Sequence, residues 1–162
     1  MGISVASIKD LIDNLGDASA HTLTDLVSKL GDMRQSIAQG KASFFEKSIT
    51  SAANAGDVTV ATITDNPCQI ESIVIHANAA QTAEMTSCGV FGGASKVITF
   101  ISAADAVQAS LDAADKQVGW SGIIRLASTK TIVISLVGTG ATAVNLTIIV
   151  KYRPTGVGGY LV

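Results

Sequence analysis

The chain has 162 residues, a net charge of −2 and 48% hydrophobic residues, whereas charged residues make up 15% and aromatic residues 4%. This length suits one compact domain with an appendage. The low charged fraction indicates that part of the surface is covered by protein, most simply by further copies of the chain. With no run of Lys and Arg and no apolar run of the ~20 residues that a membrane helix needs, nucleic acid and membrane are excluded as partners.

Residues 1–42 are predicted to form an N-terminal helical arm with a tandem short repeat. Segments 8–17 and 23–32 share Asp, Leu, Leu, Gly and Asp at matching positions, and each has apolar residues at i, i+3, i+4 and i+7. This is the spacing of a two-turn amphipathic helix. Because helices this short are marginal alone, their apolar stripes must dock on other subunits, on a partner or on the chain's own β domain. The stripes, which are candidate contacts, are Ile8, Leu11, Ile12, Leu15, Leu23, Leu26, Val27 and Leu30.

Residues 43–153 are predicted to form a β domain. Alternating or continuous apolar runs bounded by turn residues predict strands at 44–50, 58–63, 68–77, 84–91 and 96–101. Gly92-Gly93-Ala94-Ser95 is the expected turn of a hairpin. With three further strands downstream, the total is roughly eight strands in about 110 residues, which favours a mainly β chain with an antiparallel β-sandwich of the jelly-roll kind.

Two segments complete the predicted sandwich. Ser102-Ala103-Ala104-Asp105 has the hydroxyl and the carboxylate of a helix start, so a short helix or helical loop is expected between Ser102 and Lys116, crossing from one sheet to the other. Residues 118–152 alternate strictly and have short linkers, which predicts an antiparallel meander. Its inward row, from Trp120 to Tyr152, should be core. The candidate subunit contacts on its outer face are Ile123, Val133 and Ile149.

Residues 154–162 are predicted to be a flexible, glycine-rich tail with an apolar tip. Pro154 should end the last strand, because proline cannot donate a ladder hydrogen bond. The tip contains Tyr160 and Leu161, and it is interpreted either as an arm that inserts into a neighbouring subunit or as a disordered terminus.

The ionisable residues form no recognisable catalytic or metal-binding pattern, which predicts a protein that is not an enzyme and holds no cofactor or metal. The two histidines, at 21 and 76, lack ligands or a nucleophile at suitable spacing. Aspartates 105, 112 and 115 miss the calcium-loop spacing, and the glutamates at 46, 71 and 84 suggest no catalytic carboxylate pair. Cys68 and Cys88 are interpreted as buried thiols, although spacing alone leaves a disulfide open.

Two features resemble the structural proteins of tailed-bacteriophage virions. The first is the arrangement Leu15-Gly16-Asp17, Thr22-Leu23 and Leu30-Gly31-Asp32, similar to helical segments that recur in those proteins. The second is the β region, whose strand at 70–73, turn at 136–140 and ending at 150–153 look like those of head-decoration or fibre-like modules.

The resemblance implies a non-enzymatic capsid decoration (cement) protein or head-fibre protein. Such proteins are commonly homotrimers with a β-sandwich body and an arm. The implied partners are further copies of the chain and the major capsid protein or another virion protein. The implied location is the capsid surface, after synthesis in the host cytoplasm. A fibre, tail or receptor-binding module is the alternative, and a carbohydrate-binding jelly roll is the second alternative.

Overall fold

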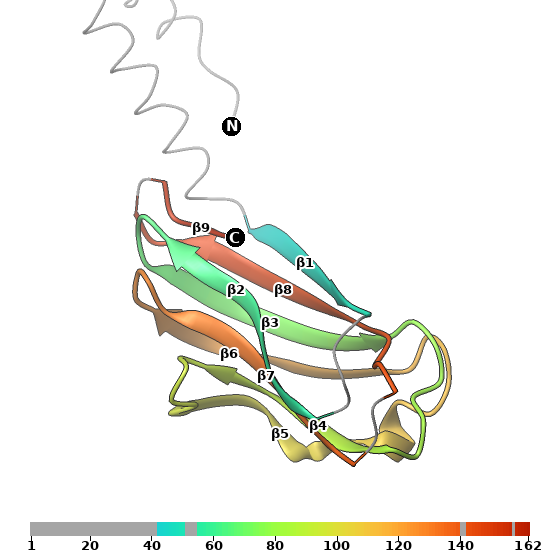
Figure 1. The fold of residues 1–162 in the computed structure, drawn as a ribbon. Helices are drawn as coiled ribbons and strands as arrows, with labels where there is room; N and C mark the ends of the chain where they lie inside the picture. Colours follow the sequence, from blue (N-terminus) through green and yellow to red (C-terminus); the bar gives the residue numbers. More distant parts are fainter. Residues whose placement is uncertain (1–41, 51–54, 140–141, 157) are drawn as a thin grey trace, which may run out of the picture. The chain divides into compact units, whose positions relative to one another are not determined.

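The computed structural model describes residues 42–50, 55–139, 142–156 and 158–162 (Figure 1). The predicted helical arm, with its eight stripe residues between 8 and 30, lies outside the described residues. The described part consists of nine strands and one 3-10 helix, η1 (Gln108–Ser110). The strands are β1 (Ser43–Ile49), β2 (Gly56–Thr64), β3 (Cys68–Ala77), β4 (Met85–Gly92), β5 (Ile98–Val107), β6 (Gln117–Leu126), β7 (Thr131–Gly138), β8 (Leu146–Pro154) and β9 (Tyr160–Leu161).

The strands form two antiparallel sheets, which confirms the prediction of a mainly β, antiparallel fold. One sheet has the order β1-β8-β3-β6 and the other the order β5-β4-β7-β2-β9. Strand β1 pairs with β8, β2 with β7, β3 with β6 and β4 with β5. In this nested pairing the first half of the chain pairs with the second half as one long hairpin, and that hairpin folds into two sheets. It is the topology of an eight-stranded jelly roll.

The core lies between the two sheets and is built by every second residue of the central strands. Ile73 and Ile75 of β3 and Ile132 and Ile134 of β7 are fully buried, and all belong to one hydrophobic cluster. Burying each such side chain contributes roughly 1.5–3 kcal/mol. The predicted inward row from Trp120 to Tyr152 is confirmed, since its members lie in this cluster or pack against it.

Trp120 joins the two sheets where β6 lies beside β5. Its ring meets Phe100 edge-on, with centroids 4.9 Å apart and an interplanar angle of 69°. Such a pair is worth about 0.5–1.5 kcal/mol beyond the area that it buries. A Cβ on Gly122 would lie 2.5 Å from the Trp120 ring, so the glycine leaves room for the indole. Trp120 is therefore a packing residue.

The prediction of a meander over residues 118–152 is wrong. Strands β6 and β8 belong to the four-stranded sheet, and β7 lies between β4 and β2 in the other sheet. The connection through Thr129, whose φ is 69°, carries the chain from one sheet to the other. Alternation states which residues face the core, but a strand in a meander and a strand in a sandwich alternate in the same way. The alternation of apolar and polar residues therefore does not predict which strand pairs with which.

The short helix predicted between Ser102 and Lys116 is present as η1, but the predicted start at Ser102 is wrong, because β5 continues to Val107. Ile101 pairs with Val90 and Ala106 pairs with Cys88, so residues 102–105 bulge out opposite a single residue of β4. The Ser102 hydroxyl donates to the Asp105 carboxylate at 2.6 Å. The residues that suggest a helix cap therefore close a wide bulge. The segment after η1 does cross from one sheet to the other, as predicted.

The C-terminal residues pair with the body and do not form a free tip, so the prediction of a flexible tail is wrong for residues 160–162. Thr62 and Val162 exchange two backbone hydrogen bonds, of 2.8 and 3.0 Å. Leu161 is 6% exposed and belongs to the chain's own core. A Cβ on Gly159 would lie 2.8 Å from the Asn66 carbonyl oxygen, so this glycine permits close packing.

The sandwich has two ends, and each end is formed by a different set of connections between strands (Figure 1). We call the end at which β1 begins the entry end, and the opposite end the far end. The entry end is formed by residues 65–67, 93–97, 127–130, 155–156 and 158–162. The far end is formed by residues 78–84, 108–116 and 142–145.

Both cysteines are free and fully buried, as the first of the two interpretations predicts. Burial raises the pKa of the Cys68 thiol and raises the pKa of the Cys88 thiol to about 12. Both residues are therefore neutral, apolar members of the core at physiological pH, and neither has the lowered pKa of a reactive thiol.

We expect Cys88 to make the fold less stable above pH 9. The unfolded thiol ionises near its ordinary pKa of 9.0, whereas the folded thiol stays protonated up to about pH 12. The contribution of Cys88 to the free energy of unfolding is thus fully present below pH 9 and is lost as the pH rises above 9. In urea unfolding under reducing conditions, the native chain should lose about 2–3 kcal/mol more than Cys88→Ala between pH 9 and 11. Parallel curves for the two proteins would contradict this assignment.

Candidate functional site

The charged side chains of the described residues pair locally and do not converge on a reaction centre. Glu71 accepts from Arg153 Nε at 2.9 Å and lies 3.1 Å from Lys151 Nζ. These hydrogen bonds, the one from Arg153 first, lower the pKa of Glu71. Lys96 donates to Asp57 at 2.7 Å and lowers the pKa of that carboxyl. Both acids are held ionised by basic neighbours, which is unsuitable for proton transfer near neutral pH.

The three aspartates of the 102–116 segment serve separate contacts. Asp105 accepts from Ser102, Asp112 pairs with Lys116, and Asp115 lies 3.6 Å from His76 Nε2. Within the described ranges, no three His, Cys, Asp or Glu residues come together in a way that would hold a metal ion.

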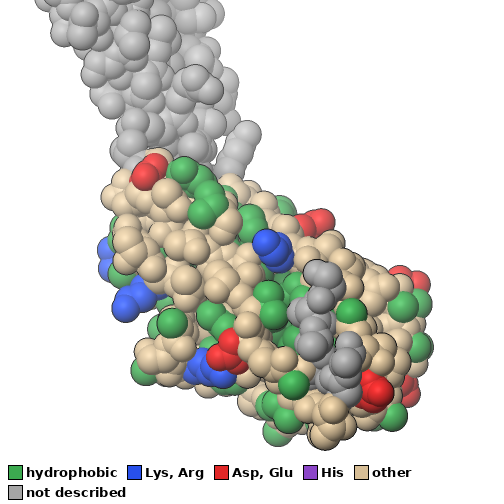
Figure 2. Space-filling model, in the orientation of Figure 1, with side chains coloured by type: hydrophobic (Ala, Val, Ile, Leu, Met, Phe, Trp, Pro, Cys, Tyr) green, Lys and Arg blue, Asp and Glu red, His purple; other side chains and the backbone are tan. Residues whose placement is uncertain are grey.

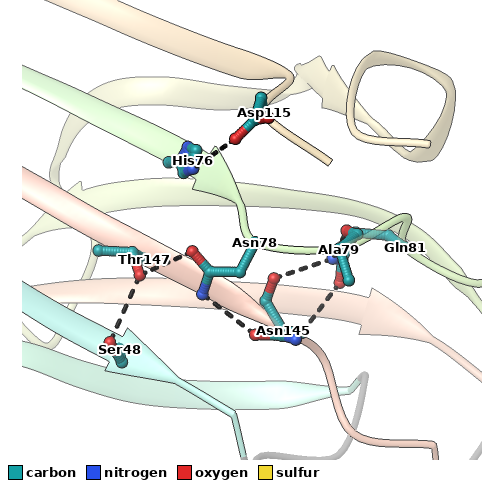
Figure 3. A network of polar contacts seen from close by, with 8 residues as sticks. All are labelled: Ser48, His76, Asn78, Ala79, Gln81, Asp115, Asn145 and Thr147. Carbon is teal, nitrogen blue, oxygen red and sulfur yellow. Dashed lines mark hydrogen bonds and ion pairs between the residues drawn. The ribbon is translucent and has the colours of Figure 1, made fainter. Parts of the chain in front are cut away.

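A polar network ties the far end together (Figure 3). Gln81, 5% exposed, donates from Nε2 to the carbonyl oxygens of Ala79 at 2.7 Å and Asn145 at 3.0 Å. Its Oε1 accepts from the Asn145 amide at 3.2 Å. Asn78 and Thr147 continue the network to β1 and β8. Because the buried amide of Gln81 is fully satisfied by the chain itself, this network is structural and offers no unused group to a ligand.

The exposed large apolar side chains gather at the entry end. Five of the seven that the structure exposes lie there, and the remaining two, Val107 and Val137, lie towards the far end. Phe44 in β1 is 66% exposed, Val97 in the β4–β5 connection 78% and Ile123 in β6 74%. The others at this end are Tyr160 and Val162.

Charge is also distributed unevenly along the sandwich. The entry end carries Asp65, Lys96, Arg125, Lys130 and Arg153, and the far end carries Glu84, Asp112, Asp115 and Lys116, so basic residues are more numerous at the entry end. In the face that Figure 2 shows, charged side chains cover only a minor part of the surface, and uncharged side chains and backbone cover most of it. Such a surface suits contact with protein more than it suits extensive hydration.

The contact residues that the sequence predicts differ in how much of each side chain is exposed to solvent. Ile123 is 74% exposed and Tyr160 43%, and Ile149 is half-buried on the outer face of the four-stranded sheet. Val133 at 5% and Leu161 at 6% are buried within the chain and have little surface for a partner. The eight predicted residues of the arm lie outside the described residues.

Sequence reasoning missed two apolar residues of the entry end, Phe44 and Val97. Phe44 is followed by Phe45, so the sequence does not say which of the two rings faces the core; Phe45 does. Val97 immediately precedes β5 and has the appearance of another strand residue in the sequence. Only the position of the β4–β5 connection shows that it projects from the end of the sandwich.

The fold is a two-sheet β module, and most of its exposed large apolar side chains lie nearer the entry end. No family model and no curated protein matches the chain. One solved structure with a similar fold is described as "Acidic stable capsid structure of Helicobacter pylori bacteriophage KHP30". It shares 13% identity, and the match covers 75% of this chain and 92% of that chain with a TM-score of 0.49. In the described part of the chain, no helix has the length and apolar character to cross a membrane.

Gln81 is expected to be the most sensitive polar position of the far end. Gln81→Leu keeps the volume but leaves the Asn145 amide and two carbonyls without their partners, at a cost of about 1–3 kcal/mol. The control, Gln117→Leu, changes an exposed glutamine of β6 and should stay within about 0.5 kcal/mol of the native chain. Urea unfolding measures both. Equal stability of the two variants would show that the network contributes nothing.

Proposed function

We propose that this chain is a non-enzymatic structural protein of a bacteriophage virion, and specifically a decoration protein that binds the assembled head as a homo-oligomer. The proposal starts from the resemblance of the repeat at 8–32 and of the β region to phage virion proteins. A decoration protein needs a rigid body and apolar contact surface and requires no reaction centre. The trimeric state implied by the resemblance is part of the proposal.

The observation that carries the proposal is the group of exposed apolar side chains at the entry end. Phe44, Val97 and Ile123 are each at least 66% exposed, although the chain has few aromatic residues. Removing such side chains from water contributes roughly 25 cal/mol per Å² before the costs of association are subtracted. Exposed apolar side chains on several elements near one end of the sandwich favour docking of that end against another protein.

The arm residues and the outer face of the four-stranded sheet are the further contacts that we propose. Ile149 lies on that face between Glu46 of β1 and Val74 of β3, so its contact would have an apolar centre with a charged group beside it, as protein interfaces with a polar rim do. The stripes of the arm supply the kind of apolar surface that two short helices bury against a partner.

We expect the full chain to assemble through the entry end. Native mass measurement should give about three times the 16.5 kDa protomer mass, and Ile123→Glu should shift the population towards smaller species by at least tenfold in apparent dissociation constant. The control, Val137→Glu, places the same charge at a side chain that is 47% exposed towards the far end, and it should leave the assembly intact. A native chain that remains monomeric at high concentration would refute the proposed oligomer.

Antibodies against the purified chain test the proposed location. In immunogold electron microscopy of intact virions of the phage that encodes it, gold particles should lie over the heads, because a decoration protein coats the shell. The control is a virion preparation from a phage lacking the gene. Labelling confined to tails or fibres would instead favour the fibre or receptor-binding module, and unlabelled virions would contradict a virion role.

A further inference from the structure

A depression of about 510 Å³ lies at the entry end, between two connections that are distant in sequence. One wall is the β4–β5 connection from Gly92 to Ile98, and the other runs from Arg125 to Thr131 between β6 and β7. A hydrogen bond of 2.7 Å from the Gly93 amide to the Thr131 carbonyl joins the two walls. This backbone hydrogen bond fixes the two connections relative to each other where they meet.

The depression is lined by two cations and by no carboxylate. Arg125 and Lys130 both line it, and neither has an ion-pair partner in the part of the chain that the structure describes. Lys96, Lys116, Lys151 and Arg153, in contrast, each lie against an acid. Two unpaired charges of one sign in a concave site concentrate the field and attract a counter-charge. The depression therefore favours an anionic group.

The other residues that line the depression indicate which further groups a ligand would carry beside its anionic group. The Thr131 hydroxyl oxygen is buried and, among the described residues, has no hydrogen-bond partner. An unused buried hydroxyl costs free energy unless a ligand or water satisfies it. Val97, Ile98 and Leu126 add apolar residues to the lining; Leu126 is buried, whereas Val97 is 78% exposed.

We propose that this depression is a binding site for a small carboxylate ligand with a short branched apolar body. The carboxylate would pair with Arg125 and Lys130, an arrangement of charge-assisted hydrogen bonds. The apolar body would cover Val97, which is 78% exposed. No aromatic ring lines the depression, which disfavours a sugar because sugars commonly stack on aromatic side chains. This inference does not depend on the proposed virion role.

The test is a titration of the ¹⁵N-labelled full chain with sodium 3-methylbutanoate at constant ionic strength, followed by amide chemical shifts. Saturable shifts are expected in residues 92–98 and 125–131, with a dissociation constant in the millimolar range. Acetate, which lacks the apolar body, should bind severalfold more weakly. The neutral isostere 3-methylbutanamide should give no saturable shift. Because these three probes are compared on the native chain, the result does not depend on the folding of any variant.

Variants assign the binding to the proposed residues. Arg125→Gln with Lys130→Gln should weaken 3-methylbutanoate binding about tenfold or more, and Val97→Ser, which removes the exposed apolar side chain, should weaken it severalfold. The matched control is Lys116→Gln, which neutralises a lysine of the far end and should bind as the native chain does. Equal binding of the amide and the acid, shifts confined to other residues, or unchanged binding by the double variant would each overturn the proposal.

Discussion

The apolar contact between the two sheets is the constraint on which the rest of the structure depends. Strand β3 lies between β8 and β6, and β7 lies between β4 and β2, so both central strands have their backbone hydrogen bonds satisfied on two sides. Their inward isoleucines are completely buried. Once these faces meet, the nested pairing fixes which connections lie at each end. The positions of the exposed and charged residues at the entry end follow from that arrangement.

The two ends of the sandwich differ in how their polar groups are hydrogen-bonded. At the far end the buried side chain of Gln81 joins the connections before β4 and β8, since both its Nε2 and its Oε1 form hydrogen bonds. The polar groups of this network are therefore satisfied within the chain. At the entry end Thr131 Oγ1 has no partner among the described residues, and Val97 projects into solvent. The internally satisfied end contributes stability, and the unsatisfied end is where binding is to be sought.

Prediction from sequence succeeded where a residue's role depends on its neighbours along the chain. The range 68–77 for β3 agrees with the structure, and Pro154 ends β8 as expected. The inward parity of residues 118–152 is likewise confirmed. The candidate contacts fared unevenly, because exposure depends on surroundings: Ile123 is open to solvent, whereas Val133 has the same outward parity and is buried in the middle of its sheet.

By itself, the sequence determined that the chain is mainly β, which residues of each strand face inward, and that charge is scarce, because side-chain alternation and composition are local properties. Tertiary structure alone decided that β6, β7 and β8 alternate between sheets, that residues 102–105 form a bulge, and that the C-terminus docks as β9. It also brought Arg125 and Lys130 beside the β4–β5 connection. Each of these depends on segments that are far apart in the chain, and strand alternation carries no information about which partner a strand will meet.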